Sequence, residues 1–176
     1  MMERRTLSGV VMRRMLLITN NRLFFGLCRP GLSVVAALEG CNDASTPLTS
    51  LDVVRIARDT IHRGWVLAHH PLYGNVRPRL QPFRTILLLE PERFVDGRPE
   101  PDLLSLHLIS EAMTVYESER ESLALVDAVP ESLARDCAFL DAELMKETLA
   151  QAGVPATWSS DRTITCCRGQ REGERL

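Results

Sequence analysis

The stretch LDVVRIARDTIHRGWVLAHHPLYGNVRPRLQPFRTILLL, residues 51–89, sets the pattern of the fold. Its first part is predicted to be an amphipathic helix, because apolar residues recur every three or four positions between residues 51 and 61. Thr49 and Asp52 have the spacing of a capping box at the start of this helix, and Gly64 is positioned to end it. The region therefore opens with a helix that packs one face onto a core.

Two predicted strands follow in the same stretch. Residues 65–70 form the first, which Pro71 stops, because proline removes a donor from the hydrogen-bonded ladder. Residues 83–89 form the second, a continuous apolar run that lies between Pro82 and Pro91. Continuous apolar strands are typical of sheets that are buried on both faces, as in α/β proteins.

The remaining chain extends this alternation of strands and helices. Short apolar runs predict strands at 15–19, 32–38 and 123–129, and apolar periodicity predicts helices that begin at 101–102 and at 130–131. We therefore expect an α/β fold: a single small domain with a mainly parallel sheet of about four to five strands, flanked by helices.

Length and composition place the domain boundaries. At 176 residues and 45% hydrophobic content, the chain is long enough for one core of ordinary size. Residues 1–14 are predicted to be an N-terminal extension and residues 15–153 the α/β domain. Residues 154–176 are polar and highly charged towards their end, which predicts a disordered tail.

Charge and cysteine content narrow the class of protein. A net charge of −2 argues against nucleic-acid binding, which usually needs a clearly basic surface. No apolar run approaches a membrane span, so we expect no membrane insertion. The five cysteines show no CxxC spacing, which favours a reduced, cytoplasmic protein over a disulfide framework or a zinc site.

The charges are nevertheless unevenly distributed. Residues 60–89 contain no Asp or Glu but four arginines, namely Arg63, Arg77, Arg79 and Arg84. Acidic residues dominate the chain from 90 to 147. This asymmetry predicts either a cationic patch beside an acidic helical surface or, more simply, arginines on solvated loops.

The candidate ligand-binding residues lie where predicted strands end. Ligands bind open α/β sheets at the carboxyl ends of the strands, where loops diverge. Asn20 and Asn21 follow one strand and His70 ends another, so parallel strands would bring them to one edge. The asparagine amides would orient a ligand, or else cap a turn. His70 would act as a base or ligand orienter, or else His69 and His70 are one buried and one exposed histidine.

The loop after His70 completes this hypothesis. Gly74 allows close backbone approach, Asn75 follows it, and Arg77 offers a two-pronged guanidinium to an anion. The alternative is a rigid surface turn fixed by prolines. The adjacent histidines point to opposite faces of a strand and cannot readily share a metal, so we expect no metal site.

No common catalytic motif or cofactor fingerprint occurs. The sequence lacks a Gly-rich P-loop, a GxSxG elbow and a GxGxxG fingerprint, so no cofactor is expected and an enzyme is the less favoured interpretation.

Several motifs, in this order, resemble the GrdX family. They are ITNN at 18–21, RD-x-IH-x-G at 58–64, HPL-x-G-x-VRP at 70–78, PF at 82–83 and, more weakly, D-x-x-FLD at 136–141. Asn75, Arg77 and Phe83 stand where the family usually has serine, lysine and tyrosine. The resemblance implies a small cytoplasmic protein associated with glycine, sarcosine and betaine reductases and with amino-acid metabolism, whose own activity is uncharacterised.

Two functions remain open. The first is an accessory protein for assembly, maturation or regulation of a reductase complex, whose partners would be reductase subunits. The second is a small enzyme or binding module for an anionic metabolite, held by the strand-end residues Asn20, His70 and Arg77.

Overall fold

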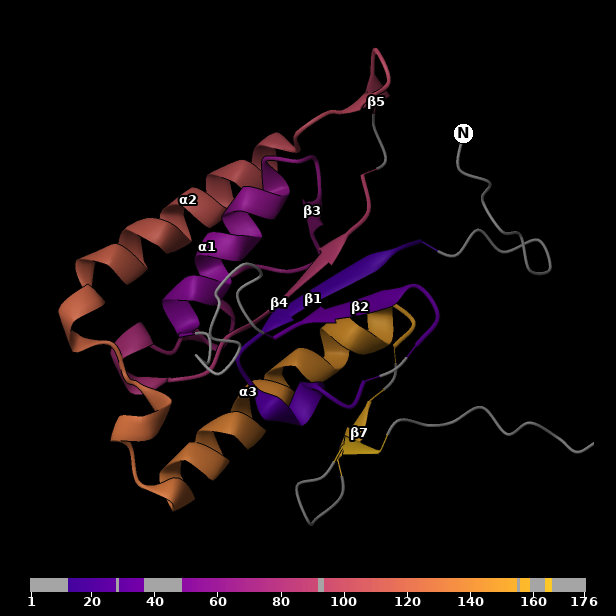
Figure 1. The fold of residues 1–176 in the computed structure, drawn as a ribbon. Coiled ribbons are helices and arrows are strands. Elements are labelled where there is room, and N and C mark those ends of the chain that lie inside the picture. Colours follow the sequence, from indigo (N-terminus) through magenta and orange to yellow (C-terminus); the bar gives the residue numbers. More distant parts are fainter. Residues whose placement is uncertain are drawn as a thin grey trace, which may run out of the picture.

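The computed structural model describes residues 13–27, 29–36, 49–91, 94–154, 156–158 and 164–165. Its centre is a four-stranded sheet between two layers of helices (Figure 1). The strands are β1 (Met15–Thr19), β2 (Leu32–Val35), β3 (Val66–Leu67) and β4 (Thr85–Leu89), in the spatial order β2-β1-β4-β3. The expected small α/β domain is therefore present.

The sheet is mixed, which corrects the expectation of a mainly parallel one. β1 and β2 are parallel, but β4 runs antiparallel to both of its neighbours, β1 and β3. Parallel neighbours need a long crossover, usually a helix, whereas the segment from β3 to β4 contains only short 3-10 turns and returns along the same sheet. The apolar run of β4 reflects its central position rather than parallel pairing.

Three helices form at the predicted places. α1 (Ser50–Ile61) begins with the predicted capping box of Thr49 and Asp52. α2 (Leu103–Ser118) is capped by the Asp102 side chain, and α3 (Glu131–Gln151) follows Pro130. The positions of the helices were therefore predictable from local signals, namely the caps of α1 and α2, Pro130 before α3, and the apolar spacing.

The two faces of the sheet carry separate apolar clusters. α1 and α2 pack together over the face that includes Ile18, Ile86 and Leu88. α3 covers the opposite face, which includes Leu17 and Leu87, as the two layers in Figure 1 show. Neighbouring residues of β1 and of β4 therefore serve different layers, as strand geometry requires.

One predicted strand is wrong and one hairpin was not predicted. Residues 123–129 contain the 3-10 turn η5 (Val126–Ala128) instead of a strand, because Asp127 and two alanines give the segment little β-propensity. β5 (Phe94–Val95) and β6 (Arg98–Pro99) form a hairpin around Asp96-Gly97, a dipeptide that favours tight hairpin turns.

The other predicted boundaries differ in length. β3 and β4 are shorter than the predicted strands at 65–70 and 83–89, and residues 37–38 of the predicted 32–38 strand lie outside the described residues. In the predicted tail, β7 (Thr157–Trp158) pairs with β8 (Ile164–Thr165). The rest of that tail beyond residue 158, and residues 1–12 of the predicted extension, also lie outside the described residues.

Candidate functional site

The strand ends chosen from the sequence do lie at one end of the sheet. β1 and β3 are both antiparallel to β4, so they run in the same direction with β4 between them. Asn20 and Asn21 after β1, and His70 after β3, are therefore at the same end. β4 begins there, which places Arg84 and Thr85 between them.

The side-chain amides of Asn20 and Asn21 are hydrogen-bonded within the protein. Buried Asn20 donates from Nδ2 to the Pro82 carbonyl at 2.8 Å and accepts the Arg84 backbone N–H at 2.8 Å, so it fixes the start of β4. Asn21 accepts the Leu23 N–H at 3.1 Å, which caps the 3-10 turn η1 (Arg22–Phe24). Asn21 therefore caps a turn, which is the alternative to ligand orientation that the sequence left open.

The loop residues are more open. His70 and Arg77 are exposed, and His70 Nδ1 accepts the Leu72 N–H at 3.1 Å. Gly74 and Asn75 both have positive φ, 75° and 48°. A Cβ at Gly74 would lie 2.5 Å from Leu144 Cδ1, so this part of the loop lies against α3.

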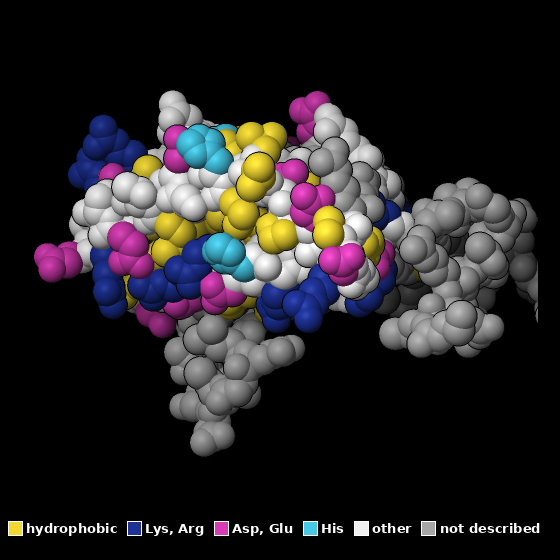
Figure 2. Space-filling model, turned by 90° about the horizontal axis from the view of Figure 1, so that it is seen from above, with side chains coloured by type: hydrophobic (Ala, Val, Ile, Leu, Met, Phe, Trp, Pro, Cys, Tyr) yellow, Lys and Arg dark blue, Asp and Glu magenta, His cyan; other side chains and the backbone are white. Residues whose placement is uncertain are grey.

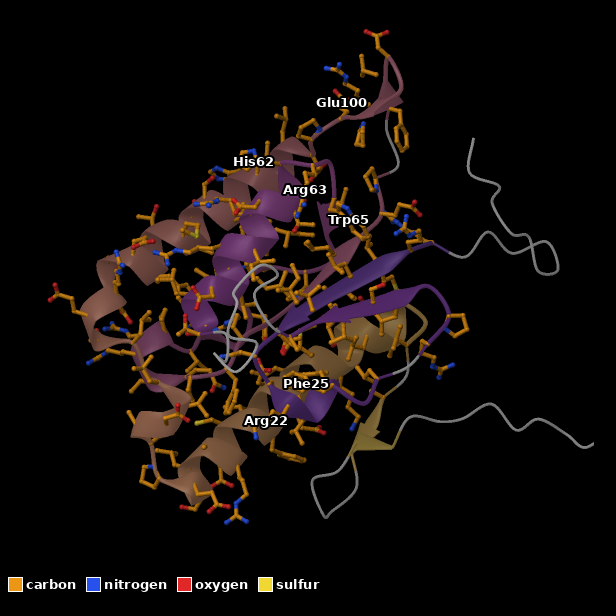
Figure 3. All side chains as sticks on the ribbon, viewed as in Figure 1. Arg22, Phe25, His62, Arg63, Trp65 and Glu100 are labelled. Atoms are coloured by element: carbon orange, nitrogen blue, oxygen red, sulfur yellow. The ribbon has the colours of Figure 1, made fainter. Side chains whose placement is uncertain are left out.

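The arginines of residues 60–89 do not form one patch. Arg84 is buried, and Arg63 lies beside His62 and Trp65 before β3, whereas Arg77 follows its other end (Figure 3). Figure 3 also places Arg22 on η1, away from Arg63. The predicted cationic stretch is thus divided between separate surfaces and the interior.

His69 is partly buried and His70 is exposed, close to the alternative of one buried and one exposed histidine. The His69 ring accepts the Leu87 N–H at Nε2, 3.1 Å away, and its Nδ1 lies 3.0 Å from the His70 carbonyl. This pairing requires the neutral ring with its proton on Nδ1. Burial lowers the pKa of His69 to about 4. The ring is therefore a structural element of the β3–β4 connection.

An interior carboxylate that the sequence did not single out occupies the α3 side of this end. Asp141 is buried, and its Oδ2 accepts from Thr85 Oγ1 at 2.7 Å and from Asn21 Nδ2 at 3.0 Å. Its Oδ1 accepts from the Tyr73 hydroxyl. Thr19 joins the group through a 2.7 Å hydroxyl contact with Thr85. We call these five residues the Asp141 cluster.

Within the Asp141 cluster, the hydrogen bond from Tyr73 to Asp141 depends on the protonation of the phenol. Burial, reinforced by the Asp141 charge, raises the pKa of Tyr73 well above its usual range. The Tyr73 hydroxyl thus stays protonated and donates to the carboxylate, while it accepts the Thr85 N–H at 3.1 Å. The sequence signals for this cluster were the ITNN motif at 18–21, which contains Thr19 and Asn21, and the weak motif at 136–141, which contains Asp141. Nothing in the sequence connected them, because they lie far apart in the chain.

Arg84 is the second unpredicted feature, on the α1–α2 side. It is 1% exposed; its Nε donates to the Tyr116 hydroxyl at 2.8 Å, and its Nη1 donates to the Tyr73 carbonyl at 3.3 Å. The guanidinium carbon lies 4.6 Å from the centre of the Tyr73 ring, a cation–π contact. Among the described residues, no carboxylate pairs with it and Nη2 has no partner.

Cys137 of α3 is a free cysteine. Burial raises the pKa of the Cys137 thiol, which disfavours the reactive thiolate. Within the described ranges, no three His, Cys, Asp or Glu side chains gather as a metal site. No helix in the described part of the chain is both long and apolar enough to cross a membrane.

The fold and this site define a small α/β protein with hydrogen-bonded charges buried at one end of a mixed sheet. The model of the family described as GrdX-like protein matches residues 16–150, which is most of the chain. The chain belongs to this family, as its motifs indicated. Neither the curated proteins nor the solved structures contain a match to it.

Proposed function

We propose that this GrdX-family chain is a non-catalytic accessory protein that acts with glycine, sarcosine or betaine reductase in assembly, maturation or regulation. The observation that carries the proposal is that the polar groups at the strand ends are engaged in the protein's own hydrogen bonds. Asp141 accepts three of them, His69 is held neutral, and Asn20 bridges two backbone groups. An acid–base pair for catalysis would need such groups to be free.

An accessory role also needs a surface for a partner. The start of α2 exposes Leu103 and Leu104, at 80% and 65%, close in sequence to the exposed Phe94 and Val95. Figure 2 shows hydrophobic side chains at the surface between acidic, basic and histidine side chains. Exposed leucines surrounded by charge are typical of protein contacts, so we expect a reductase subunit to contact α2.

The proposal is tested by co-purification. Tagged chain, expressed in a host that makes the reductases, should recover a reductase subunit at modest salt. Leu104→Ser should weaken recovery, whereas Leu133→Ser on α3, also exposed, is the control and should not. If folded wild-type chain recovers no reductase subunit, the accessory role is wrong. If both variants behave as wild type, only the α2 contact is wrong.

A second candidate is a binding module for an anionic metabolite. The shared direction of β1 and β3 supports it, because it brings the ligand set to one end of the sheet. That set is Asn20, Asn21, His70, Gly74, Asn75 and Arg77. Exposed Arg77 would supply the charge that attracts a carboxylate or acyl phosphate.

Thermal unfolding separates this candidate from the first. A ligand that binds only the folded state raises the melting temperature, so small carboxylates or acyl phosphates should do so. Arg77→Ala and His70→Ala should abolish the increase, while Arg79→Ala, which is also an exposed arginine, should keep it. An increase that survives Arg77→Ala would contradict this site.

A further inference from the structure

Two buried polar groups on the α1–α2 side have no partner. Arg84 Nη2 and Ser50 Oγ are buried and make no hydrogen bond in the part of the chain that the structure describes. Both residues are 1% exposed. A buried donor without a partner costs free energy, and native proteins rarely leave one in that state, so each such group points to something that binds it.

Tyr116 lies next to both Arg84 and Ser50. Its hydroxyl accepts from Arg84 Nε at 2.8 Å. Burial raises the pKa of Tyr116, while the Arg84 charge and polar interactions of the hydroxyl with Arg84 and Ser50 act in the opposite direction. The Ser50 hydroxyl therefore lies within reach of the phenol, although its geometry falls short of a full hydrogen bond. Ser50 and Arg84 thus flank the same side chain.

The position of Ser50 adds a further attraction for negative charge. Ser50 is the first residue of α1, a twelve-residue helix. The first backbone N–H groups of a helix lack partners within it, and the helix dipole favours anions there. The capping box satisfies the N–H of Asp52 through Thr49 Oγ1, so this end of α1 carries a built cap next to Ser50.

The group that would bind Arg84 Nη2 should be negatively charged, because Arg84 is a buried cation. A buried cation is normally paired with an anion, because desolvation of an isolated charge is costly. Asp141 is the carboxylate that acts on Arg84 electrostatically, but its oxygens accept from Tyr73, Asn21 and Thr85 instead. An oxyanion would accept from Nη2 and from the Ser50 hydroxyl at once.

We infer that Arg84, Tyr116 and Ser50 form an interior binding site for a small oxyanion, a carboxylate or a phosphate, at the N-terminus of α1. Because the site is buried, it admits only a ligand of a few heavy atoms, which enters when the surrounding structure opens locally. This site uses none of the Asn20, His70 and Arg77 side chains and does not depend on the proposed function.

Calorimetric titration of the full chain tests the inference, with sodium phosphate and sodium acetate as probes at constant ionic strength in chloride. We expect saturable binding of at least one probe, and the probe that binds identifies the class of anion. Ser50→Ala should weaken binding about tenfold, since it removes one hydrogen bond to a charged group. Ser110→Ala, an exposed serine of α2, is the control and should leave the affinity unchanged.

Tyr116→Phe provides an independent variant, because it keeps the ring and removes only the hydroxyl that orients Arg84. It should also weaken the affinity. The inference is overturned if neither probe binds saturably, which would mean that water or a direct Arg84–Ser50 contact satisfies both groups. Binding that is unchanged in both Ser50→Ala and Tyr116→Phe would place the anion elsewhere and equally overturn it.

Discussion

The neutral His69 ring makes the stability of the protein depend on pH in a calculable way. Its pKa is about 4 in the folded state, against 6.5 for a free histidine. The unfolded chain therefore binds more protons at mildly acidic pH, and the folded state loses relative stability as the pH falls from 6.5 towards 4. Single-site linkage gives a loss of about 1.4 kcal/mol at about pH 5.5 and almost none at about pH 7.5.

Urea unfolding at these two pH values measures this loss. His69→Gln cannot titrate, so its stability should fall less than that of wild type between about pH 7.5 and about pH 5.5, by about 1 kcal/mol. His62→Gln, at the exposed end of α1, is the matched control and should follow wild type. If His69→Gln and wild type lose the same stability over this interval, His69 does not stay neutral inside the protein and the hydrogen-bond assignment is wrong.

Two further predictions concern buried geometry and are checked by chemical denaturation. Asp141→Asn should destabilise the fold by about 2–3 kcal/mol, because the new amide N–H₂ faces side chains that donate. The control Asp127→Asn, on an exposed turn, should cost under about 0.5 kcal/mol. Equal effects of the two substitutions would contradict the hydrogen bonds of the Asp141 cluster. Gly64→Ala should cost about 3 kcal/mol, because φ is 95° and a Cβ would lie 2.3 Å from Pro99 Cβ. Gly97→Ala, with φ of 75° and open space around it, should cost only about 1 kcal/mol, and a Gly64 variant as mild as this would refute the packing argument.

The sequence predicted the helices well because their signals are local. The Thr49 and Asp52 spacing and the Asp102 cap each act within one turn, so the helix starts could be read without knowledge of the tertiary fold. Strand direction is not local. The apolar residues of β4 are compatible with parallel or antiparallel pairing, and only the helix-free return from β3 decides between them.

The interior charges could not have been found in the same way. Tyr73 and Asp141 lie 68 positions apart, and their hydrogen bond depends on α3 packing across the sheet. Arg84 was predicted to lie in the strand at 83–89 and was counted among the arginines of a cationic patch or solvated loops, yet Tyr116 and Tyr73 enclose it. Asn20 and Asn21 were correctly placed at a strand end, but their hydrogen-bond partners on other segments were not visible in the sequence.

Tyr73 contacts both layers of the protein at once: its ring and carbonyl meet Arg84, and its hydroxyl meets Asp141. Arg84 binds Tyr116 of α2, whereas Asp141 belongs to α3. Separation of α3 from the sheet would therefore disturb the contacts of α2 as well. The two helical layers should open as one cooperative unit, with common amide-exchange behaviour, although their apolar clusters lie on opposite faces of the sheet.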